Sequence, residues 1–271
     1  MTDKNFSTTD KQEAEERMAP SAKIIHASIY KEAISELSRS SSALFWSGLA
    51  AGLSMGFSMI SEGLLMANLP DVKWIGLITN FGYSIGFLIV ILGKQQLFTE
   101  NTLTPVLPLL ERKDLKTLWQ VLRLWGVVIV ANLIGAVIIA FVASQTKVFD
   151  PHVQKAFEEI GKMAMEPSFD VTLLRGIFAG WLIALIVWLL PYAETARIWI
   201  IIIITYIIGV GHLSHSIAGS VEVFTLAFME QTSWWNAIVG FTVPALIGNI
   251  IGGVTIVAVL NHAQVNAESS K

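Results

Sequence analysis

Six long apolar segments follow one another along the chain, separated by short polar connections. They cover residues 43–67, 74–110, 119–144, 172–192, 197–229 and 234–260. Because one helical crossing of a membrane needs about 20 mostly apolar residues, the pattern predicts an all-α integral membrane protein. Its six transmembrane helices are expected within residues 41–262. Gly48, Gly52 and Gly56 recur every four residues in the first segment, which predicts a close approach between helices.

The second and fifth segments differ from the others in length and polarity. Each is longer than one crossing requires and carries a polar run near its middle, LFTENT from Leu97 and HSIAGS from His215. A broken helix has unpaired backbone groups, which hydrocarbon cannot satisfy, so it persists only inside protein or beside a water-filled cavity. Helices 2 and 5 are therefore predicted to be broken and to line a path.

The third and sixth segments share a short pattern. ANLIGAVIIAF contains Asn132 and GNIIGGVTIVAV contains Asn249, and in each a glycine follows three residues after the asparagine. Thr99 lies 33 residues before Asn132, and His215 lies 34 residues before Asn249. Because three crossings reverse the direction of the chain, this spacing predicts two inverted three-helix repeats around a central path.

The ends of the chain are polar. Residues 1–21 are charged and lack apolar periodicity, which predicts a disordered cytoplasmic tail. In residues 22–40, apolar side chains recur at helical spacing among lysines and glutamates, which predicts an amphipathic helix at the membrane surface. Residues 263–271 are expected to form a second cytoplasmic tail.

Composition and charge agree with a chain solvated by lipid. Of the 271 residues, 54% are hydrophobic and 14% are charged, against about 25% charged residues in soluble domains. The chain has no cysteine, which excludes disulfides and cysteine-ligated metals. Basic residues cluster on one side of the predicted spans, and by the positive-inside rule this places both termini in the cytoplasm. They are Lys23, Lys31, Arg39, Arg112, Lys113, Lys116, Arg123 and Arg197.

The two predicted breaks have an electrostatic consequence. In the inverted arrangement, the half-helices after Thr99 and His215 begin near the middle of the membrane and run to opposite sides. Each helix N-terminus carries about half a positive elementary charge, so their combined field favours an anion. His212 lies one turn before His215, but no carboxylate completes a ligand set, so no metal site is expected. No motif for an enzyme or a bound cofactor is found.

Three runs carry a family resemblance: YSIGFLIVILGKQQLFTENT from Tyr83, HSIA from His215 and GNIIGG from Gly248. They resemble the formate/nitrite transporter family, and within it the YfdC-like branch, over nearly all of residues 22–262. The resemblance implies an aquaporin-like fold assembled as a homopentamer in the lipid bilayer of the inner membrane. Each protomer is then expected to hold a pore for small monovalent anions or their acids. A nucleic acid is not an expected partner.

The resemblance also implies which residues lie along the path. His215 matches the central pore histidine and Thr99 the facing threonine. The other implied positions are Leu97, Phe98, Tyr83, Phe87 and Ile208 at constrictions and Asn249 in the last helix.

The chemistry of these side chains can be weighed separately. A neutral imidazole at membrane depth can donate a hydrogen bond to an anion or lend it a proton. Apolar collars raise the barrier for a charged anion more than for its neutral acid. Helix capping by Thr99 and plain packing by the apolar side chains are equally consistent with the sequence. For Asn249, as for Asn132, hydrogen bonding between helices is the stronger expectation.

Some positions depart from the common transporter pattern. By motif match, Gly180 stands where an asparagine is usual and Ser214 where an acidic residue is usual. A lysine that precedes the fourth helix in typical members has Lys162 as its nearest counterpart, displaced by two positions. These differences leave the substrate open.

Charged residues near the breaks raise a second possibility. Lys94 and Glu100 flank the first break, and Glu222 lies seven residues after His215. A carboxylate along an anion path opposes permeation unless it is protonated or paired, so Lys94 is expected to pair with Glu100 or Glu222, as a gate or as a structural contact. A non-conducting structural or regulatory membrane protein with the same fold is therefore the alternative. A water or glycerol facilitator is disfavoured because the chain lacks an Asn-Pro-Ala pair.

Overall fold

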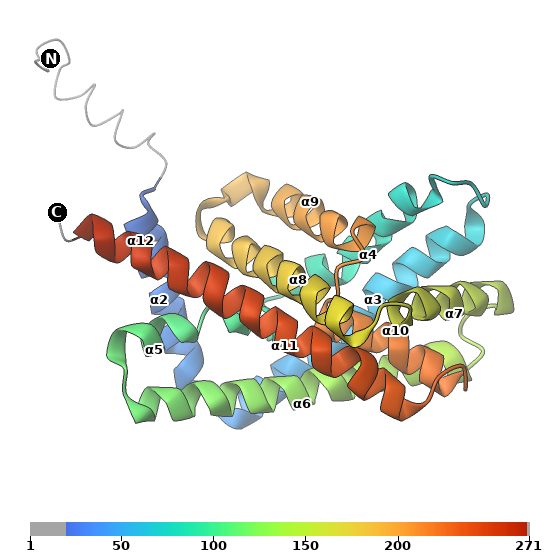
Figure 1. Cartoon of the computed structure of the whole chain (residues 1–271), viewed down its shortest axis with the longest axis horizontal. Helices are drawn as coiled ribbons and strands as arrows, with labels where there is room; N and C mark the ends of the chain where they lie inside the picture. The colour runs from blue at the N-terminus through green and yellow to red at the C-terminus, as the bar shows by residue number, and fades with distance from the viewer. Residues whose placement is uncertain (1–19, 270–271) are drawn as a thin grey trace, which may run out of the picture.

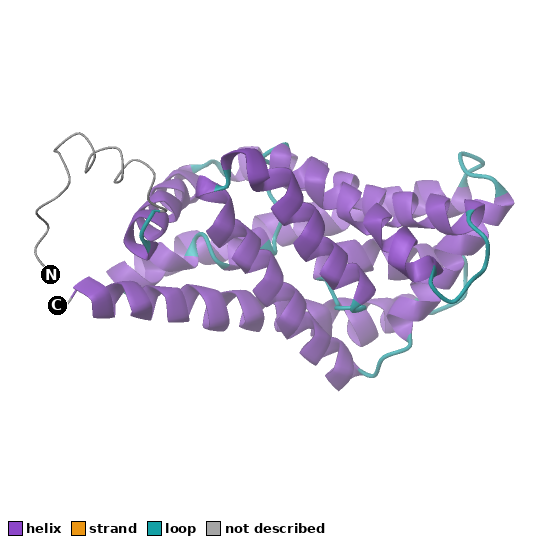
Figure 2. Cartoon of the chain, turned by 90° about the horizontal axis from the view of Figure 1, so that it is seen from above, coloured by secondary structure: helices purple, strands orange, loops and turns teal. Residues whose placement is uncertain are grey.

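The computed structural model describes residues 20–269, and all regular elements among them are helices (Figures 1 and 2). The α-helices are α2 (Ala22–Ser38), α3 (Ser41–Asn68), α4 (Ile75–Leu92), α5 (Val106–Arg112), α6 (Leu115–Gln145), α7 (Pro151–Met165), α8 (Phe169–Leu189), α9 (Arg197–Val210), α10 (Ser216–Phe228), α11 (Val243–Ile251) and α12 (Leu260–Ser269). Short 3-10 turns are η1 (Glu100–Thr102), η2 (Leu190–Tyr192) and η3 (Glu194–Ala196). Two segments are π-helical: η4 (Asn236–Thr242) leads into α11, and η5 (Gly252–Val259) joins α11 to α12, so the four elements form one continuous helical run.

Five stretches within residues 20–269 are long and apolar enough to cross a membrane. They are Ser41–Asn68, Ile75–Leu92, Leu115–Gln145, Phe169–Tyr192 and Asn236–Gln264. The predicted segment 197–229 is instead divided into two short helices, α9 with 14 residues and α10 with 13 residues. The predicted segment 74–110 is likewise interrupted, because α4 ends at Leu92 and α5 begins at Val106.

The ends of the described chain are helical. α2 covers most of the predicted surface helix and buries one face through Ile29, Ala33 and Leu37. It contacts α12, and both lie at the same end of the molecule as α5 (Figure 1). Most of the predicted tail 1–21 lies outside the described residues, and α12 continues through the predicted tail 263–271 as far as Ser269.

Glycines allow the long helices to approach each other closely. α3 packs along α6, and α8 packs along α11. A Cβ atom added at Gly52 would lie 2.2 Å from the carbonyl oxygen of Asn132, and one added at Gly180 would lie 2.3 Å from the carbonyl oxygen of Asn249. These contacts fix the positions of both asparagines between their neighbouring helices. Of the two glycines, Gly52 belongs to the four-residue spacing of α3.

We predict that Gly52→Ala destabilises the protein, because the new methyl group must separate α3 from α6. Overpacking of this kind costs about 1–3 kcal/mol, and the thermal unfolding midpoint of purified protein in detergent should fall. Gly126→Ala in α6 is the matched control, since nothing lies within 4 Å of an added Cβ there. Equal midpoints for the two variants would contradict the prediction.

Candidate functional site

The two helix breaks begin with the same turn. Two residues after the end of α4, Lys94 lies in the left-handed region at φ 51°, and the N–H of Gln95 donates back to the Val90 carbonyl at 3.0 Å. Two residues after the end of α9, His212 has φ 47°, and the N–H of Leu213 donates back to the Ile208 carbonyl at 2.9 Å. A left-handed residue followed by this return bond is a common helix C-terminus. The backbone therefore leaves α4 and α9 with the same geometry.

Asn132 of α6 holds the first break by its side chain. Its Oδ1 accepts the N–H of Phe98 at 2.9 Å. Its Nδ2 donates to the carbonyls of Gln96 at 2.9 Å and of Gly48 at 2.7 Å. The backbone groups on either side of Leu97 are thus paired, although no helix supplies their partners.

Asn249 of α11 holds the second break in the same way. Its Oδ1 accepts the N–H of Ser216 at 2.8 Å. Its Nδ2 donates to the carbonyls of Ser214 at 2.9 Å and of Gly176 at 2.8 Å. All three bonds of Asn132 have a counterpart here, with His215 between the two clamped groups.

The matching bonds correct the register of the internal pattern. Sequence spacing pairs Thr99 with His215, whereas the hydrogen bonds place Leu97 at the position equivalent to His215. Thr99 lies two residues farther along the first break. It nevertheless meets His215 in space, because its Oγ1 lies 2.7 Å from His215 Nε2.

The hydrogen bonds of His215 fix the position of its proton. Nδ1 accepts the N–H of Ala218 at 3.1 Å, so His215 caps α10 with an unprotonated nitrogen. The neutral ring then carries its proton on Nε2, which donates to Thr99 Oγ1. The hydroxyl proton of Thr99 is consequently directed elsewhere. His215 is 1% exposed and Thr99 is fully buried, so the pair is enclosed.

Apolar side chains surround the histidine and threonine pair. The Phe87 ring meets the His215 ring edge to face at 4.9 Å between centroids, and Tyr83 lies 5.4 Å from Phe87. The other side chains expected at constrictions, Leu97, Phe98 and Ile208, belong to the same hydrophobic cluster.

Two cavities approach this centre from opposite ends of the molecule. The α7-side cavity has a volume of about 60 Å³ and reaches His215. The polar residues that line it include Glu62, Asn80, Tyr83, Arg175, His212, Ser214 and Glu222. The α2-side cavity has a volume of about 330 Å³. Its polar lining includes Glu32, Glu36, Lys94, Gln96, Glu100, Asn101 and Arg197.

The ion pair expected for Lys94 is not the one found. Lys94 Nζ lies 3.0 Å from Glu32 Oε1, which joins the first break to α2. A pair with Glu222 is wrong because Glu222 lines the other cavity. Glu100 shares the α2-side cavity with Lys94, but its Oε1 is buried without a hydrogen-bond partner among the described residues.

Sequence reasoning missed Glu62 and Arg175 of the α7-side cavity. Glu62 is only 8% exposed and is the single charged residue of α3. Arg175 lies in α8 and brings a cation to the same cavity. A charged residue inside an apolar span is a signal of function, and it could have identified both.

Comparisons with known proteins decide the family. A model described as "Formate/nitrite transporter" matches residues 23–263. The chain belongs to the formate/nitrite transporter family. It is 40% identical over 256 residues to the inner membrane protein YfdC of Escherichia coli (strain K12), which covers 94% of this chain and 83% of YfdC. The predicted resemblance to this family and its YfdC-like branch is confirmed, and the family is one of membrane transport proteins, not enzymes.

Two solved structures of known proteins are similar in fold to this chain. One is described as "Pentameric formate channel with formate bound", with a TM-score of 0.70, 21% identity, and coverage of 81% of this chain and 95% of that one. The other is described as "FNT family ion channel", with a TM-score of 0.75, 19% identity, and coverage of 87% and 96%. The all-helical membrane architecture predicted from the sequence is therefore confirmed.

We predict that Asn249→Ala strongly destabilises the protein. The change leaves the Ser216 N–H and the carbonyls of Ser214 and Gly176 without their partner, and each unsatisfied buried group costs about 1–3 kcal/mol. Thermal unfolding in detergent measures the loss. Asn68→Ala is the control, since Asn68 is exposed and its side chain donates one bond to the carbonyl of Leu64. If both variants melt at the same temperature, Asn249 does not hold the break.

Proposed function

We propose that the protein is a multi-pass inner-membrane channel or transporter for small monovalent anions, of the formate and nitrite type, or for their acids. The observation that carries the proposal is the enclosed hydrogen bond between His215 and Thr99, where the two broken helices meet. Membership of the formate/nitrite transporter family supports the substrate class. The pentameric formate channel of similar fold supports assembly as a homopentamer.

The proposal includes six crossings in an aquaporin-like arrangement of two inverted three-helix repeats. α4 with α5 forms one broken crossing, and α9 with α10 forms the other. The matched bonds of Asn132 and Asn249 support this repeat. The distribution of basic residues supports cytoplasmic termini. With this orientation the α2-side cavity faces the cytoplasm and the α7-side cavity faces outward.

The central pair offers hydrogen bonds and not a formal charge. An anion arriving from the α7-side cavity meets the neutral imidazole of His215 and the hydroxyl of Thr99. The N-terminus of α10 adds a partial positive charge at the same point. Arg175 attracts the anion into the α7-side cavity. Glu62 and Glu222 line the same cavity, and their carboxyl groups can exchange protons with the anion.

The apolar side chains set the barrier on both sides of the pair. Tyr83 and Ile208 border the α7-side cavity together with His215. Leu97 and Phe98 lie in the chain between Gln96 and Asn101, which border the α2-side cavity. A neutral acid loses less hydration free energy than its anion in such a constriction. Asn249 contributes to the path indirectly, by holding the backbone around His215.

A non-conducting structural or regulatory protein is the second candidate. Three glutamates, Glu32, Glu36 and Glu100, line the α2-side cavity beside Lys94 and Arg197, and Lys94 is paired with Glu32. Carboxylates along the route of an anion disfavour its entry. The contact between α2 and the first break would then be a fixed closure.

Flux in liposomes separates these functions. We predict that wild-type protein transports formate and nitrite and that Thr99→Val lowers the flux at least about tenfold, because a hydrogen bond to a charged group contributes about 1.5–3 kcal/mol. Thr172→Val is the matched control. It makes the same change at a buried threonine whose hydroxyl has no partner among the described residues.

The outcomes are distinct. If wild-type protein gives no flux above empty liposomes, the non-conducting alternative is favoured. If wild-type protein transports both anions and Thr99→Val matches Thr172→Val, transport stands but the central pair does not control it. His215→Ala then reports whether the histidine acts alone.

A further inference from the structure

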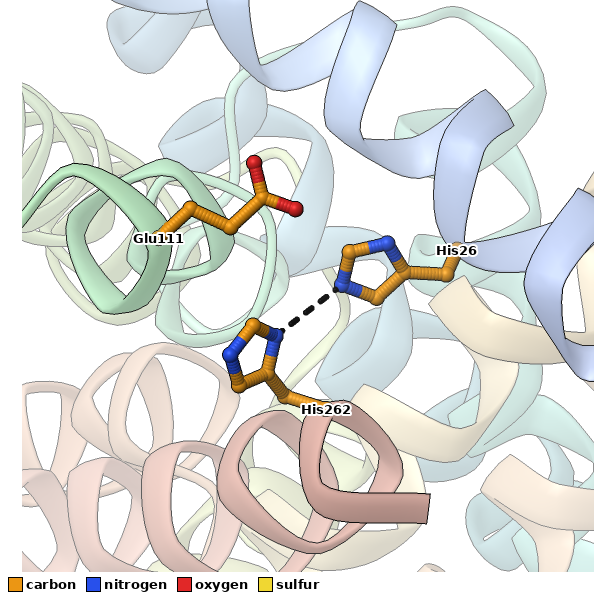
Figure 3. Close-up of side chains that lie close together, drawn as sticks. All are labelled: His26, Glu111 and His262. Atoms are coloured by element: carbon orange, nitrogen blue, oxygen red, sulfur yellow. Dashed lines mark hydrogen bonds between the residues drawn. The ribbon is translucent and has the colours of Figure 1, made fainter. Parts of the chain in front are cut away.

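Three potential metal ligands meet at the end of the molecule that carries α2 and α12. His26 comes from α2, Glu111 from α5 and His262 from α12, and their side chains point toward one another (Figure 3). One ligand atom from each lies within 4.8 Å of the other two. The two histidines are 236 positions apart in the chain, so only the fold brings them together.

The spacing of the two imidazoles fits coordination of one ion. His26 Nε2 and His262 Nδ1 lie 3.3 Å apart. Two nitrogens that bind Zn²⁺ at about 2.0–2.1 Å in tetrahedral geometry are about 3.3–3.4 Å from each other. The same distance is long for a hydrogen bond from an N–H group, which usually measures about 2.7–3.2 Å. The two nitrogens share a hydrogen bond in this structure, and their separation is also the one that two imidazole ligands of a tetrahedral ion would have (Figure 3).

The surroundings prepare His26 for this role. It is 6% exposed, with the rings of Tyr30 and Trp188 at centroid distances of 6.3 Å and 6.5 Å. The packed rings limit the rotation of the side chain before an ion arrives.

Glu111 supplies a third ligand with freedom to adjust. Its side chain is exposed at the end of α5 and lies beside both histidines. A rotation of the side chain can therefore bring a carboxylate oxygen onto an ion held by the two imidazoles. Two histidines and one glutamate leave the fourth tetrahedral position for water.

We propose that His26, Glu111 and His262 bind a divalent transition metal ion of the zinc type. Two imidazole ligands favour such an ion over Mg²⁺ or Ca²⁺, which prefer oxygen ligands. The ion joins α2 and α12 to α5, the helix that follows the first break. The site is separate from the transport path, so it neither requires nor supports the proposed function.

Metal binding is tested on full-length protein without an affinity tag. Zn²⁺ titration by calorimetry should give one equivalent per protomer, and Co²⁺ should produce the visible absorption of a tetrahedral complex. His262→Ala should weaken Zn²⁺ binding more than about tenfold, because one of two imidazole ligands is removed. Saturating Zn²⁺ should raise the thermal unfolding midpoint of the wild type and not of this variant.

Two further variants guard against misfolding and against adventitious binding. Glu111→Gln changes an exposed side chain, leaves the fold intact, and should weaken binding and alter the Co²⁺ spectrum. His152→Ala removes an exposed histidine of α7 and should leave binding unchanged. Absence of saturable Zn²⁺ binding by the wild type would overturn the proposal. So would one-equivalent binding that His262→Ala and Glu111→Gln leave intact.

Discussion

Pairing of backbone groups at the two helix breaks is the constraint on which the rest of the structure depends. A break inside a membrane exposes N–H and carbonyl groups where no water can bind them. Asn132 and Asn249 each pair two of these groups, one N–H and one carbonyl, and donate a third bond to a carbonyl of a neighbouring helix. The close approach of α3 to α6 and of α8 to α11 follows, because each asparagine must reach a carbonyl on the neighbouring helix.

The two breaks, fixed by Asn132 and Asn249, bring His215 and Thr99 together. The second break turns His215 into the cap of α10, which fixes its proton on Nε2 and directs it to Thr99. Apolar side chains then exclude water around a pair that has no net charge. The charged residues nearest to this pair line the two cavities on either side of it. This separation matches the requirements of a path that admits an anion but strips its hydration only at one point.

Much of this could be predicted from the sequence, and the limits have physical causes. The lengths of segments 74–110 and 197–229 and the repeated asparagine indicated the breaks, because local polarity within an apolar run is visible in sequence. The sequence did not identify Glu32 as the partner of Lys94, because this ion pair depends on how α2 lies against the bundle. The equivalence of Leu97 with His215 was also missed, because hydrogen bonds and not residue types define it. Contacts such as His26 with His262 join opposite ends of the chain and leave no local pattern.

The matched clamps hold different residues, a leucine in one half and a histidine in the other. The hydrogen bonds fix only backbone atoms, so the side chain at the clamped position can change its chemistry without changing the fold. Scaffold and specificity are thus separable in this architecture.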